Sequence, residues 1–375
     1  AYAEVLADID PTGIDSRDAL ARLPLTRKSG LVDRQRQAPP FGGLVAARRE
    51  DWQKVFASPG PIYEPQTDRH DYWRLARALY AAGFRAGHLV HNTYSYHLTP
   101  AGSMLESGAS ALGCSVVPAG VGQTEQQVEV IHHLRPDGYV GTPSFLKILL
   151  DRAAELDLDA GSIRRASVSG EALPPSLRQE LADRGVGVLQ TYATADVGVI
   201  ADESDAIDGM IVDEDVVLEI VRPGSGDPLP EGEVGEVVVT VLNPDYPLIR
   251  FATGDLSAVL PGASPCGRTN MRIKGWMGRA DQTTKVRGMF VRPEQVNAVA
   301  ARHPEVERYR LVVSRSGHQD SMTLRCLVSA PGESLRESLE SSVRDLCKLR
   351  AEIEFVSPEV LPNDGKVIED ARSYE

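Results

Sequence analysis

The chain has 375 residues, with 40 Lys and Arg against 53 Asp and Glu, so its formal net charge is −13. At roughly 150 residues per domain, this length predicts two or three domains. With 42% apolar and 25% charged residues, the chain has enough apolar side chains for a packed core, which excludes the disordered class. The excess of acidic residues argues against a nucleic-acid scaffold, because phosphate backbones are held mainly by clustered Lys and Arg.

Membrane and redox signals are weak in this sequence. No apolar run approaches the roughly 20 residues that a membrane-spanning helix needs, and the first residues, AYAEVLADIDPTG, contain no basic segment followed by an apolar one. We therefore expect a cytosolic protein, monomeric or homodimeric, with no membrane partner. The four cysteines lie far apart and form no C-x-x-C pair, so buried thiols are expected rather than disulfides or a zinc site: Cys114, Cys266, Cys326 and Cys347.

Helical and strand-like segments alternate through the first half of the chain. A short helix is expected near residues 17–23 and a longer one at 71–83, where apolar residues follow helical spacing. Further helices are expected at 124–134, 143–156 and 176–185, and strands at 88–94, 138–142, 164–170 and 186–193. Such alternation with short connections builds a parallel sheet covered by helices. Ligands of such sheets lie beyond the carboxyl ends of the strands, so residues 169–172 and 192–196 are candidate site segments.

The pattern changes in the second half of the chain. Two β-rich runs flank a Gly/Pro turn in DVVLEIVRPGSGDPLPEGEVGEVVVTVL, which indicates a separate antiparallel sheet or barrel over about 210–275. Helices at 293–303 and 333–348 then alternate with strands, as in a small α+β domain. The predicted fold class is α/β, with a large domain at 1–281 that combines the mostly parallel sheet with the β-rich part, and a small α+β domain at 282–375.

Six segments in chain order carry the functional signal: HLVHNTYSYHL (88–98), SGEALP (169–174), TYATAD (191–196), RFATGDL (250–256), GRADQTTKVRGMFVRPEQV (278–296) and LPNDGK (361–366). Together they resemble the adenylate-forming acyl-CoA synthetases, most closely the phenylacetate–CoA ligase family. Connecting segments are also similar to family sequences: LPLTRKSGL at 23–31, VPAGVGQTEQQVEVI at 117–131, RPDGYVGTPSFL at 135–146 and LPEGEVGEVVVT at 229–240. The resemblance covers nearly the whole chain.

The resemblance implies a two-step reaction. A carboxylate and ATP give an acyl-adenylate and pyrophosphate; the thiol of coenzyme A then attacks the mixed anhydride and AMP leaves. Two anions must meet in the first step, so the family neutralises charge with Mg²⁺ and a mobile lysine. Lys366 stands at that position in LPNDGK, although a solvated surface lysine is the alternative interpretation. The family also implies that the small domain is a mobile lid with its hinge at Asp281.

Nucleotide contacts are implied for several motif residues. Asp255 matches the family aspartate whose two oxygens accept hydrogen bonds from both ribose hydroxyls, and Arg279 matches the arginine that contacts ribose or phosphate. A turn aspartate after a glycine is the alternative for Asp255. Tyr192 matches the aromatic residue that stacks on adenine, but a core tyrosine has the same pattern. The adenine edge is expected along the backbone of Ser169, Gly170 and Glu171.

The TYATAD segment also implies a metal contact. At the position of Asp196 the family usually has glutamate, which positions Mg²⁺ near the phosphates. Aspartate is one methylene shorter, so the resemblance implies a weaker direct contact with the ion, or a contact through a bridging water. Thr194, in the same segment, is assigned to the nucleotide.

The phosphate loop is the largest departure from the family. Family members carry a Ser/Thr/Gly-rich stretch ending in Gly-Lys-Pro, whose N–H groups and hydroxyls cradle the β- and γ-phosphates. The chain has FASPGPIYEP here, in which Ser58 and Gly60 remain as nucleotide-binding candidates. Pro59 and Pro61 remove N–H donors, and Glu64 places a negative charge where the lysine would be. This composition argues against ATP binding through the usual loop, and AMP is expected to bind about as tightly as ATP, or more tightly.

The acid is expected in an aromatic pocket. The family builds this pocket from a Tyr-Gly-Tyr-Gly stretch, which corresponds to Tyr94, Ser95, Tyr96 and His97. Ser95 and His97 are larger than the glycines that they replace. An aryl or arylacetic acid is the first hypothesis, and a smaller or more polar acid also fits a narrowed pocket that contains a histidine.

No structural zinc is predicted. Relatives often hold zinc with a Cys and a His after the tyrosine motif and a Cys-Pro-Cys stretch, but this chain has Ser264 for the first of those two cysteines, and one thiolate cannot hold zinc. The pair His132–His133 is expected on a helix surface, and the acidic run from Asp202 to Asp215 on a solvated face.

Three functional hypotheses remain. The first is an AMP-forming acid–thiol ligase that uses ATP, Mg²⁺ and coenzyme A. The second is a divergent relative that keeps the fold and the AMP half-site but does not adenylate from ATP, and acts as an acyltransferase or a ligand-binding pseudoenzyme. The third is a carrier-protein-loading enzyme, whose thiol is a phosphopantetheine arm. Lys366 and Asp255 favour catalysis, whereas the altered loop favours the second hypothesis.

Overall fold

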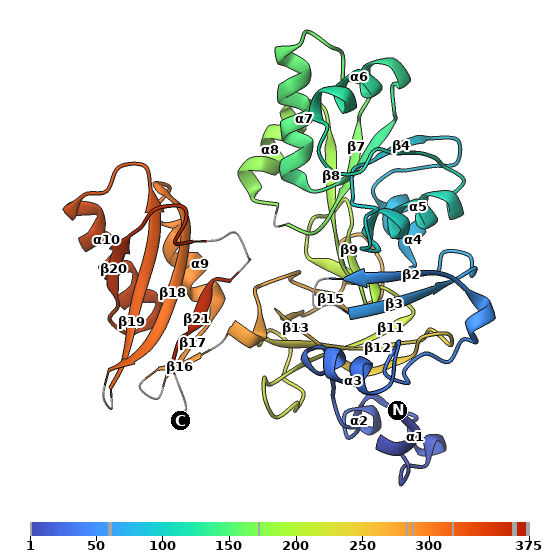
Figure 1. The fold of residues 1–375 in the computed structure, drawn as a ribbon, viewed down its shortest axis with the longest axis horizontal. Helices are drawn as coiled ribbons and strands as arrows, with labels where there is room; N and C mark the ends of the chain where they lie inside the picture. Colours follow the sequence, from blue (N-terminus) through green and yellow to red (C-terminus); the bar gives the residue numbers. More distant parts are fainter. Residues whose placement is uncertain are drawn as a thin grey trace. The chain divides into compact units, whose positions relative to one another are not determined.

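The chain forms two compact units in the structure, a computed structural model (Figure 1). Unit 1 comprises residues 1–253 and 257–276, and unit 2 comprises residues 254–256 and 277–375. The residues described are 2–58, 62–171, 173–282, 284–286, 289–316, 319–361 and 366–372. Each unit has an apolar core of its own.

Unit 1 is built around a nine-stranded mixed sheet with the order β14-β15-β10-β9-β8-β7-β6-β4-β5. Its parallel half consists of β5 (Ser115–Pro118), β4 (Leu89–Asn92), β6 (Gly138–Gly141), β7 (Arg165–Val168) and β8 (Gly187–Thr194). Its antiparallel half consists of β9 (Gly198–Glu203), β10 (Met210–Val212), β15 (Arg272–Ile273) and β14 (Val259–Leu260). The first half of β8 pairs with β7 and its second half pairs with β9, so the carboxyl end of β8 lies where the pairing changes.

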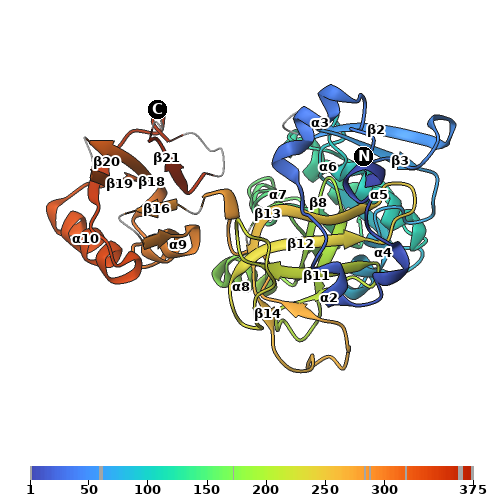
Figure 2. The same cartoon turned by 90° about the horizontal axis from the view of Figure 1, so that it is seen from below.

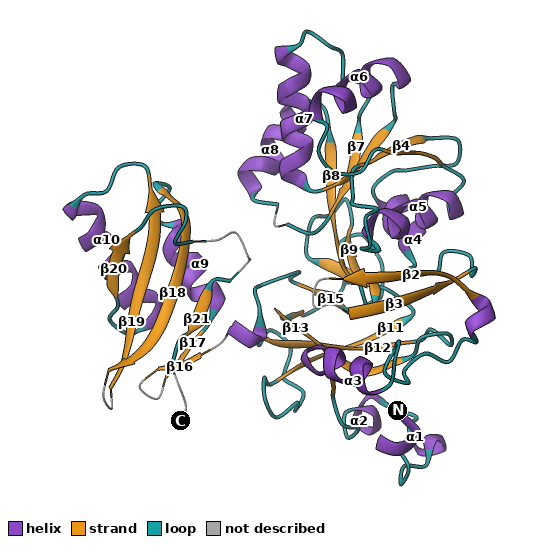
Figure 3. Ribbon diagram, in the orientation of Figure 1, coloured by secondary structure: helices purple, strands orange, loops and turns teal. Residues whose placement is uncertain are grey.

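Helices cover both faces of the parallel half (Figure 3). One face carries α4 (Leu75–Ala81) and α5 (Ala101–Ala111), and the other carries α6 (Thr124–Leu134), α7 (Pro143–Glu155) and α8 (Pro175–Asp183). Successive residues of a strand point to opposite faces, and on β6 Tyr139 packs with the second group of helices while Val140 packs with the first. The sheet is therefore buried on both faces, which explains its apolar strands.

A second sheet of unit 1 has the order β1-β13-β12-β11, and its three long strands lie side by side in Figure 2. Its strands are β1 (Thr26–Arg27), β11 (Val216–Val221), β12 (Gly235–Val241) and β13 (Leu248–Ser257), of which β11 and β12 are antiparallel while β1 runs parallel to β13. A hairpin is formed by β2 (Trp52–Ser58) and β3 (Ile62–Thr67). The N-terminal part adds α1 (Tyr2–Val5), η1 (Pro11–Gly13), α2 (Arg17–Leu20), η2 (Lys28–Gly30), α3 (Leu31–Gln37) and η3 (Arg49–Asp51).

Unit 2 is a small α+β structure. Its sheet has the order β20-β19-β18-β21, and its helices α9 and α10 pack against that sheet in a common core. The elements are η4 (Ala280–Gln282), β16 (Thr284–Val286), β17 (Met289–Val291), α9 (Pro293–Ala301), β18 (Val306–Ser316), β19 (Gln319–Val328), α10 (Glu333–Cys347), β20 (Glu352–Phe355) and β21 (Ile368–Asp370). Pro293 at the first turn of α9 is favourable because the N–H that proline lacks would have no helical partner there.

The predicted α/β fold class is confirmed, and most predicted elements lie within a few residues of the observed ones. The β-rich part differs in one respect. β11, β12 and β13 form the expected separate sheet, whereas β10, β14 and β15 from the same region extend the large sheet instead. Several elements were not predicted, among them the hairpin β2–β3, the helix α5 and the strands β5 and β9. Among the described helices, none is both long and apolar enough to span a membrane.

Candidate active site

A cavity of about 180 Å³ lies at the carboxyl ends of the parallel strands in unit 1. Three predicted site segments line it: Tyr94 follows β4, Ser169 and Gly170 follow β7, and Thr194 ends β8. This is the location that parallel α/β sheets give to their ligands. Its other walls come mainly from α4, α5 and the two residues before α5: Leu75, Thr99, Pro100, Ala101, Met104 and Leu105. The remaining lining residues are Ser58, Ser167, Thr191, Ala193 and Ala195.

Tyr94 anchors one wall of this cavity. Its hydroxyl donates a hydrogen bond to the carbonyl of Gly141 at 2.8 Å and also lies 3.2 Å from the carbonyl of Ser169, so the ring is fixed between the ends of β6 and β7. Burial raises the pKa of Tyr94 well above its ordinary value, so the phenol stays neutral. The cavity therefore presents an uncharged aromatic face.

The rest of the predicted acid-binding stretch lies elsewhere. The Tyr96 hydroxyl accepts a hydrogen bond from Asn92 at 2.8 Å, the backbone N–H of His97 donates to Ser95, and the His97 side chain is exposed. Neither Tyr96 nor His97 lines the cavity. The assignment of Tyr96 and His97 to the acid therefore stays a prediction, which this cavity does not support.

The segment expected at the adenine edge is a tight turn after β7. The backbone N–H of Ser169 donates to Gly141, and Gly170 has a φ of +80°, which a residue with a side chain rarely adopts. Glu171 is exposed and accepts a hydrogen bond from Ser144 at 2.6 Å. Ala172 lies outside the described residues. Ser169 and Gly170 are the described residues of this turn that line the cavity.

Tyr192 and Thr194 lie in the last three residues of strand β8. Tyr192 is 7% exposed and belongs to the apolar core, so the core interpretation that competed with stacking on adenine has direct support. Thr194 accepts a hydrogen bond from the N–H of Val197 at 3.2 Å, which closes the turn between β8 and β9. Asp196 sits in this turn, next to the cavity residues Thr194 and Ala195.

Asp196 is paired with a lysine that the sequence did not single out. The ammonium of Lys28 lies 2.5 Å from Oδ2 of Asp196; the carboxylate is fully buried, whereas the Lys28 side chain is 27% exposed. The other oxygen, Oδ1, is buried and has no hydrogen-bond partner among the described residues. Lys28 reaches this point because β1, directly before it, pairs with β13 at Phe251 and Ala252.

The hairpin β2–β3 replaces the expected phosphate loop. Pro59, Gly60 and Pro61, at its tip, lie outside the described residues. Ser58 and Glu64 face inward, and the Ser58 hydroxyl donates to Oε1 of Glu64 at 2.7 Å. Glu64 is 0% exposed, and burial together with the nearby Asp196 raises its pKa to about 8.

Burial therefore argues against the negative charge that was expected for Glu64 near neutral pH. Removing a carboxylate from water disfavours its charged form, so the group keeps its proton below about pH 8. The expectation that AMP binds as tightly as ATP rested partly on repulsion of the phosphates by a charged Glu64, and this part of the argument no longer holds. The loss of N–H donors at the two prolines is unaffected by this correction.

Asp255 and Arg279 are brought together within unit 2. Nη1 of Arg279 donates to Oδ1 of Asp255 at 3.1 Å, and the two residues also form an isolated antiparallel backbone bridge. Gly254 makes this approach feasible, because a Cβ at that residue would lie 2.7 Å from Nη2 of Arg279. The pair places a carboxylate and a guanidinium side by side.

Lys366 and Asp281 also belong to unit 2. Lys366 is exposed and precedes β21, and its carbonyl accepts a hydrogen bond from Arg310 at 3.2 Å. The residues before it, 362–365, lie outside the described part of the chain, as does the side chain of Asp281, which belongs to η4. The units divide after Trp276, a few residues before the expected hinge. The catalytic role of Lys366 and the hinge role of Asp281 remain predictions.

Comparison with known proteins identifies the family. The AMP-binding enzyme model matches residues 74–241. A phenylacetate–coenzyme A ligase of Thermus thermophilus is 37% identical over 342 residues, which are 87% of this chain and 76% of that enzyme. A phenylacetate–coenzyme A ligase of Aromatoleum evansii is 31% identical over 375 residues, with coverage of 93% and 83%. The chain belongs to the phenylacetate–coenzyme A ligase family.

Solved structures agree with this family at the level of the fold. A crystal structure of 2-hydroxyisobutyryl-CoA ligase in the postadenylation state has a TM-score of 0.81 and covers 98% of this chain and 85% of its own, at 24% identity. The adenylate-forming fold of the phenylacetate–coenzyme A ligase family is thus present across both units.

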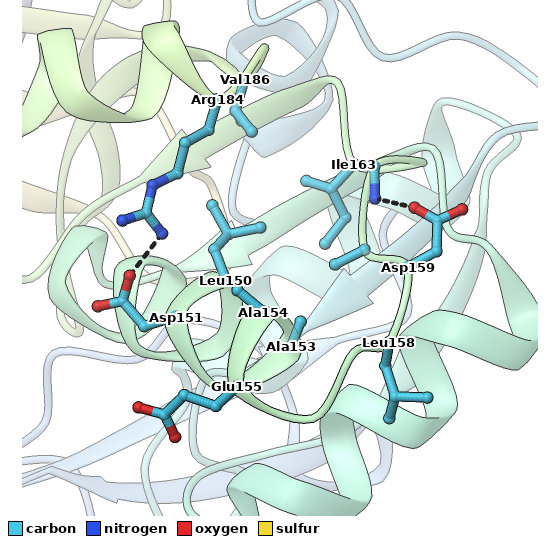
Figure 4. A pocket seen from close by; sticks show the side chains of 12 residues that line it. Leu150, Asp151, Ala153, Ala154, Glu155, Leu158, Asp159, Ile163, Arg184 and Val186 are labelled. Atoms are coloured by element: carbon cyan, nitrogen blue, oxygen red, sulfur yellow. Dashed lines mark hydrogen bonds and ion pairs between the residues drawn. The ribbon is translucent and has the colours of Figure 1, made fainter.

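Two other hollows lie apart from the family motifs. A surface groove of about 620 Å³ beside α7 has an ion pair between Arg184 and Asp151 and a hydrogen bond from the N–H of Gly161 to Asp159 (Figure 4). A polar cavity of about 250 Å³ contains Arg74 and Asp213, whose side chains form an ion pair at 3.0 Å. Among the described residues of the family motifs, none lines either hollow.

Two smaller expectations are corrected. Asp202 and Asp213 are 2% and 5% exposed, so the acidic run is not wholly a solvated face; arginine partners compensate these buried carboxylates. Cys266 is exposed, with its sulfur 3.0 Å from the Ser264 hydroxyl, whereas the other three cysteines are buried. His132 and His133 lie on the surface of α6, as expected.

The residues that sequence reasoning missed share a property. They belong to none of the six motifs: Lys28 lies in a connecting segment, and the others lie in helices α4 and α5, namely Leu75, Met104 and Leu105. Lys28 stands within LPLTRKSGL, a segment already noted as similar to the ligase family, and this similarity was the one available signal. The cavity residues on α5 gave no signal, because that helix was not predicted.

Proposed function

We infer that the chain is an AMP-forming acid–CoA ligase, which activates a carboxylic acid as an acyl-adenylate and transfers the acyl group to coenzyme A. The observation that carries this proposal is the cavity at the carboxyl ends of the parallel strands, which combines an apolar chamber with the turns of two family motifs. Leu75 and Met104 belong to its apolar lining, and Ser169 and Thr194 are lining residues at the motif turns. Such an arrangement suits an acid whose carbon skeleton is buried while its carboxylate faces the nucleotide.

An aryl or arylacetic acid is the proposed substrate. Among the described residues that line the cavity none has a charged side chain, and Tyr94 adds an aromatic wall. Phenylacetate, the substrate in the names of the curated relatives, fits this lining. The more polar acid that was the alternative loses its main support, because His97 does not reach the cavity.

Motif residues of each unit, taken separately, are proposed as nucleotide contacts. In unit 1, the turn at Ser169 and Gly170 is proposed to offer backbone groups to the adenine edge. Three further residues of the same motifs are proposed to contact the nucleotide: Glu171, Tyr192 and Thr194. In unit 2, the adjacent Asp255 and Arg279 are proposed to bind the ribose and the α-phosphate. Lys366 is proposed to neutralise charge while pyrophosphate leaves.

Asp196 is the proposed ligand of Mg²⁺. Its buried Oδ1 has no partner among the described residues, and carboxylate oxygens are the ligands that Mg²⁺ takes from proteins, so the residue fits the ion. When bound, the ion supplies positive charge to the phosphates. Asp196 orients that charge through its fixed position in the turn between β8 and β9.

The second hypothesis, a relative with impaired use of ATP, is not favoured, because the matched relatives are named as acid–CoA ligases over most of this chain. Coenzyme A is the proposed acceptor; a carrier protein remains the alternative thiol source.

The test is release of pyrophosphate from ATP across a panel of aryl, arylacetic and short hydroxy acids, with and without coenzyme A. We expect release with an arylacetic acid alone and acyl-CoA formation when coenzyme A is added. Release without any acyl-CoA would point to a carrier-protein thiol. The proposal would be abandoned if no acid on the panel gave pyrophosphate while the folded protein bound AMP.

A further inference from the structure

Lys366 is followed by a peptide bond whose two polar groups are both held by side chains of unit 2. The carbonyl of Lys366 accepts a hydrogen bond from Nε of Arg310 at 3.2 Å, and the N–H of Val367 donates to Oε1 of Gln282 at 2.6 Å. The same oxygen of Gln282 accepts the N–H of Ile368 at 3.2 Å. A planar peptide unit that is held at both its donor and its acceptor has little freedom to rotate. The main chain beside Lys366 is therefore fixed, although Lys366 itself is exposed.

The two side chains hold this segment from different elements. Arg310 lies on β18, is 6% exposed and also donates from Nη1 to Glu369 at 3.1 Å. The strand β21 runs parallel to β18, and the N–H of Leu311 donates to the carbonyl of Val367 at 2.9 Å. On its other side β21 has no neighbouring strand among the described elements, so N–H groups there need another acceptor. Gln282 is that acceptor at the start of the segment.

The position of Gln282 in the chain links two groups of proposed site residues. Gln282 ends η4 and directly follows Asp281, the proposed hinge. Its own N–H donates to the carbonyl of Arg279 at 3.4 Å, and Arg279 in turn pairs with Asp255 at 3.1 Å. Within unit 2, a short series of contacts thus runs from the proposed ribose-binding pair, through Gln282, to the main chain of Lys366.

We propose that Gln282 is a positioning residue for adenylation, which fixes the main chain beside Lys366 and so sets the point from which the ammonium extends. The inference rests on the proposed function, in which Lys366 neutralises charge while pyrophosphate leaves. A lysine side chain is a flexible four-carbon chain, so its ammonium reaches one place reproducibly only if its main chain is fixed. The side-chain oxygen of Gln282 does this work, because both N–H groups that it holds require an acceptor.

The experiment measures the two half-reactions of Gln282→Ala separately. We expect kcat for pyrophosphate release to fall about ten-fold or more, while KM for ATP and for the acid changes by less than about two-fold. Thioester formation from a supplied acyl-adenylate should keep the wild-type rate. Gln282→Glu, which keeps an oxygen acceptor at the same distance along the side chain, should retain most of the adenylation rate. If Gln282→Ala fails to fold, Gln282→Met, which has similar length but no oxygen, takes its place.

A double-mutant cycle shows whether Gln282 acts through Lys366. In the Lys366→Ala background, Gln282→Ala should lower the adenylation rate no further, because the group that it positions is already absent. Hydrogen exchange of the segment 366–370 gives a readout that needs no activity. The N–H groups of Val367 and Ile368 should exchange about ten-fold faster in Gln282→Ala and at the wild-type rate in Gln282→Glu.

Gln295→Ala is the matched control. Gln295 is a half-buried glutamine of the same unit, and its side chain also bonds the main chain: it accepts from the N–H of Arg292 and donates to the carbonyl of Leu346, both at 2.9 Å. Its removal takes the same chemical group from unit 2 at a place away from Lys366. It should leave the ratio of the two half-reaction rates unchanged.

The inference is overturned if Gln282→Ala slows both half-reactions equally, which would mark Gln282 as structural, or if its loss adds to that of Lys366→Ala. It is also overturned if adenylation is unchanged in Gln282→Ala. An active wild type with an insensitive Gln282→Ala would thus end this inference and keep the ligase proposal. A folded wild-type protein that releases no pyrophosphate with any acid would end both.

Discussion

Glu64 holds a proton that the unfolded chain would release. Its carboxyl group is buried against Ser58, and its pKa is raised from 4.5 to about 8. Between these values the folded state binds more protons than the unfolded state, so the free energy of unfolding falls as pH rises, by about 1.4 kcal/mol per pH unit for one proton. We predict that Glu64→Gln, which keeps an acceptor for Ser58, removes this part of the decline between pH 6 and pH 8 in urea unfolding.

The exposed Glu129 provides the control for that series. Glu129→Gln should follow the wild-type dependence on pH closely. Parallel curves for wild type and Glu64→Gln would show that Glu64 is ionised throughout this range and that its burial is compensated in another way.

Arg250 lies in a nucleotide-binding motif but has a structural environment. Its guanidinium forms two hydrogen bonds of 3.0 Å with Glu219 and donates to the carbonyls of Ala21, Leu23 and Gly226, and its side chain is 3% exposed. Breaking such a buried pair leaves an uncompensated charge. We predict that Arg250→Met lowers the free energy of unfolding by about 3–5 kcal/mol.

Chemical unfolding measures this loss, with Arg36→Met as the reference. Arg36 pairs with Asp33 at the surface, where both side chains are more than 70% exposed, and its removal should cost less than about 1 kcal/mol. Equal effects of the two substitutions would mean that the Glu219 site takes up water when Arg250 is lost.

Asp255 is the motif residue whose proposed role is simplest to test by binding. We predict that Asp255→Ala weakens AMP binding by about 1.5–3 kcal/mol, the range for hydrogen bonds to a charged group. Asp255→Asn, which keeps one acceptor, should lose less. Unchanged AMP affinity in calorimetry on folded Asp255→Ala would remove this residue from the site and leave the Arg279 contact as a purely structural pair.

The helix α5 contributes the apolar wall of the acid chamber through Met104, which is 4% exposed. We predict that Met104→Ala lowers the free energy of unfolding by about 2–5 kcal/mol and lengthens the chamber, so that ring-substituted arylacetic acids gain in kcat/KM relative to the unsubstituted acid.

Leu112→Ala separates stability from selectivity in this helix. Leu112 packs against the same core beyond the end of α5 and does not line the cavity, so it should lower stability without changing the order of acids. An unchanged order in Met104→Ala would place the acyl group outside this chamber.

Periodic helices could be predicted from the sequence, whereas two cavity-forming elements could not. The ranges of α6 and α7 follow from their apolar spacing, and Pro143 marks the start of α7. The helix α5 is rich in Gly, Ser and Ala, and its stability comes from packing that the sequence pattern does not show. In the hairpin β2–β3, prolines within FASPGPIYEP suggested a loop, although Pro65 is accommodated in β3.

The site as a whole was predictable as a set of motifs but not as a set of contacts. Motif order led to Ser169, Gly170 and Thr194, which the structure gathers around one cavity. The pairing of Lys28 with Asp196 joins residues 168 positions apart. Nothing local in either segment determines that pairing, since it follows from the register of β1 on β13.

Lys366 belongs to unit 2, and its proposed role concerns one half of the reaction. We predict that Lys366→Ala reduces adenylation much more than thioester formation from a supplied acyl-adenylate, because the charge is needed only while pyrophosphate departs. Single-turnover measurements of the two half-reactions test this. Lys348→Ala, which alters another exposed lysine of the same unit, should leave both intact; comparable losses in both half-reactions of Lys366→Ala would contradict the proposal.

Unit 2 is discontinuous in sequence, and this matters for anyone who wishes to exchange it between ligases. Residues 254–256, on β13, belong to unit 2 because they pair with 277–279: Leu256 donates to Gly278, Met277 donates to Leu256, and Asp255 bridges to Arg279. A chimaera joined only at Trp276 would take Arg279 from one ligase and Asp255 from the other. A graft that respects the structure must carry both pieces, so a two-segment crossover rather than a single splice point is the natural unit of recombination for this chain.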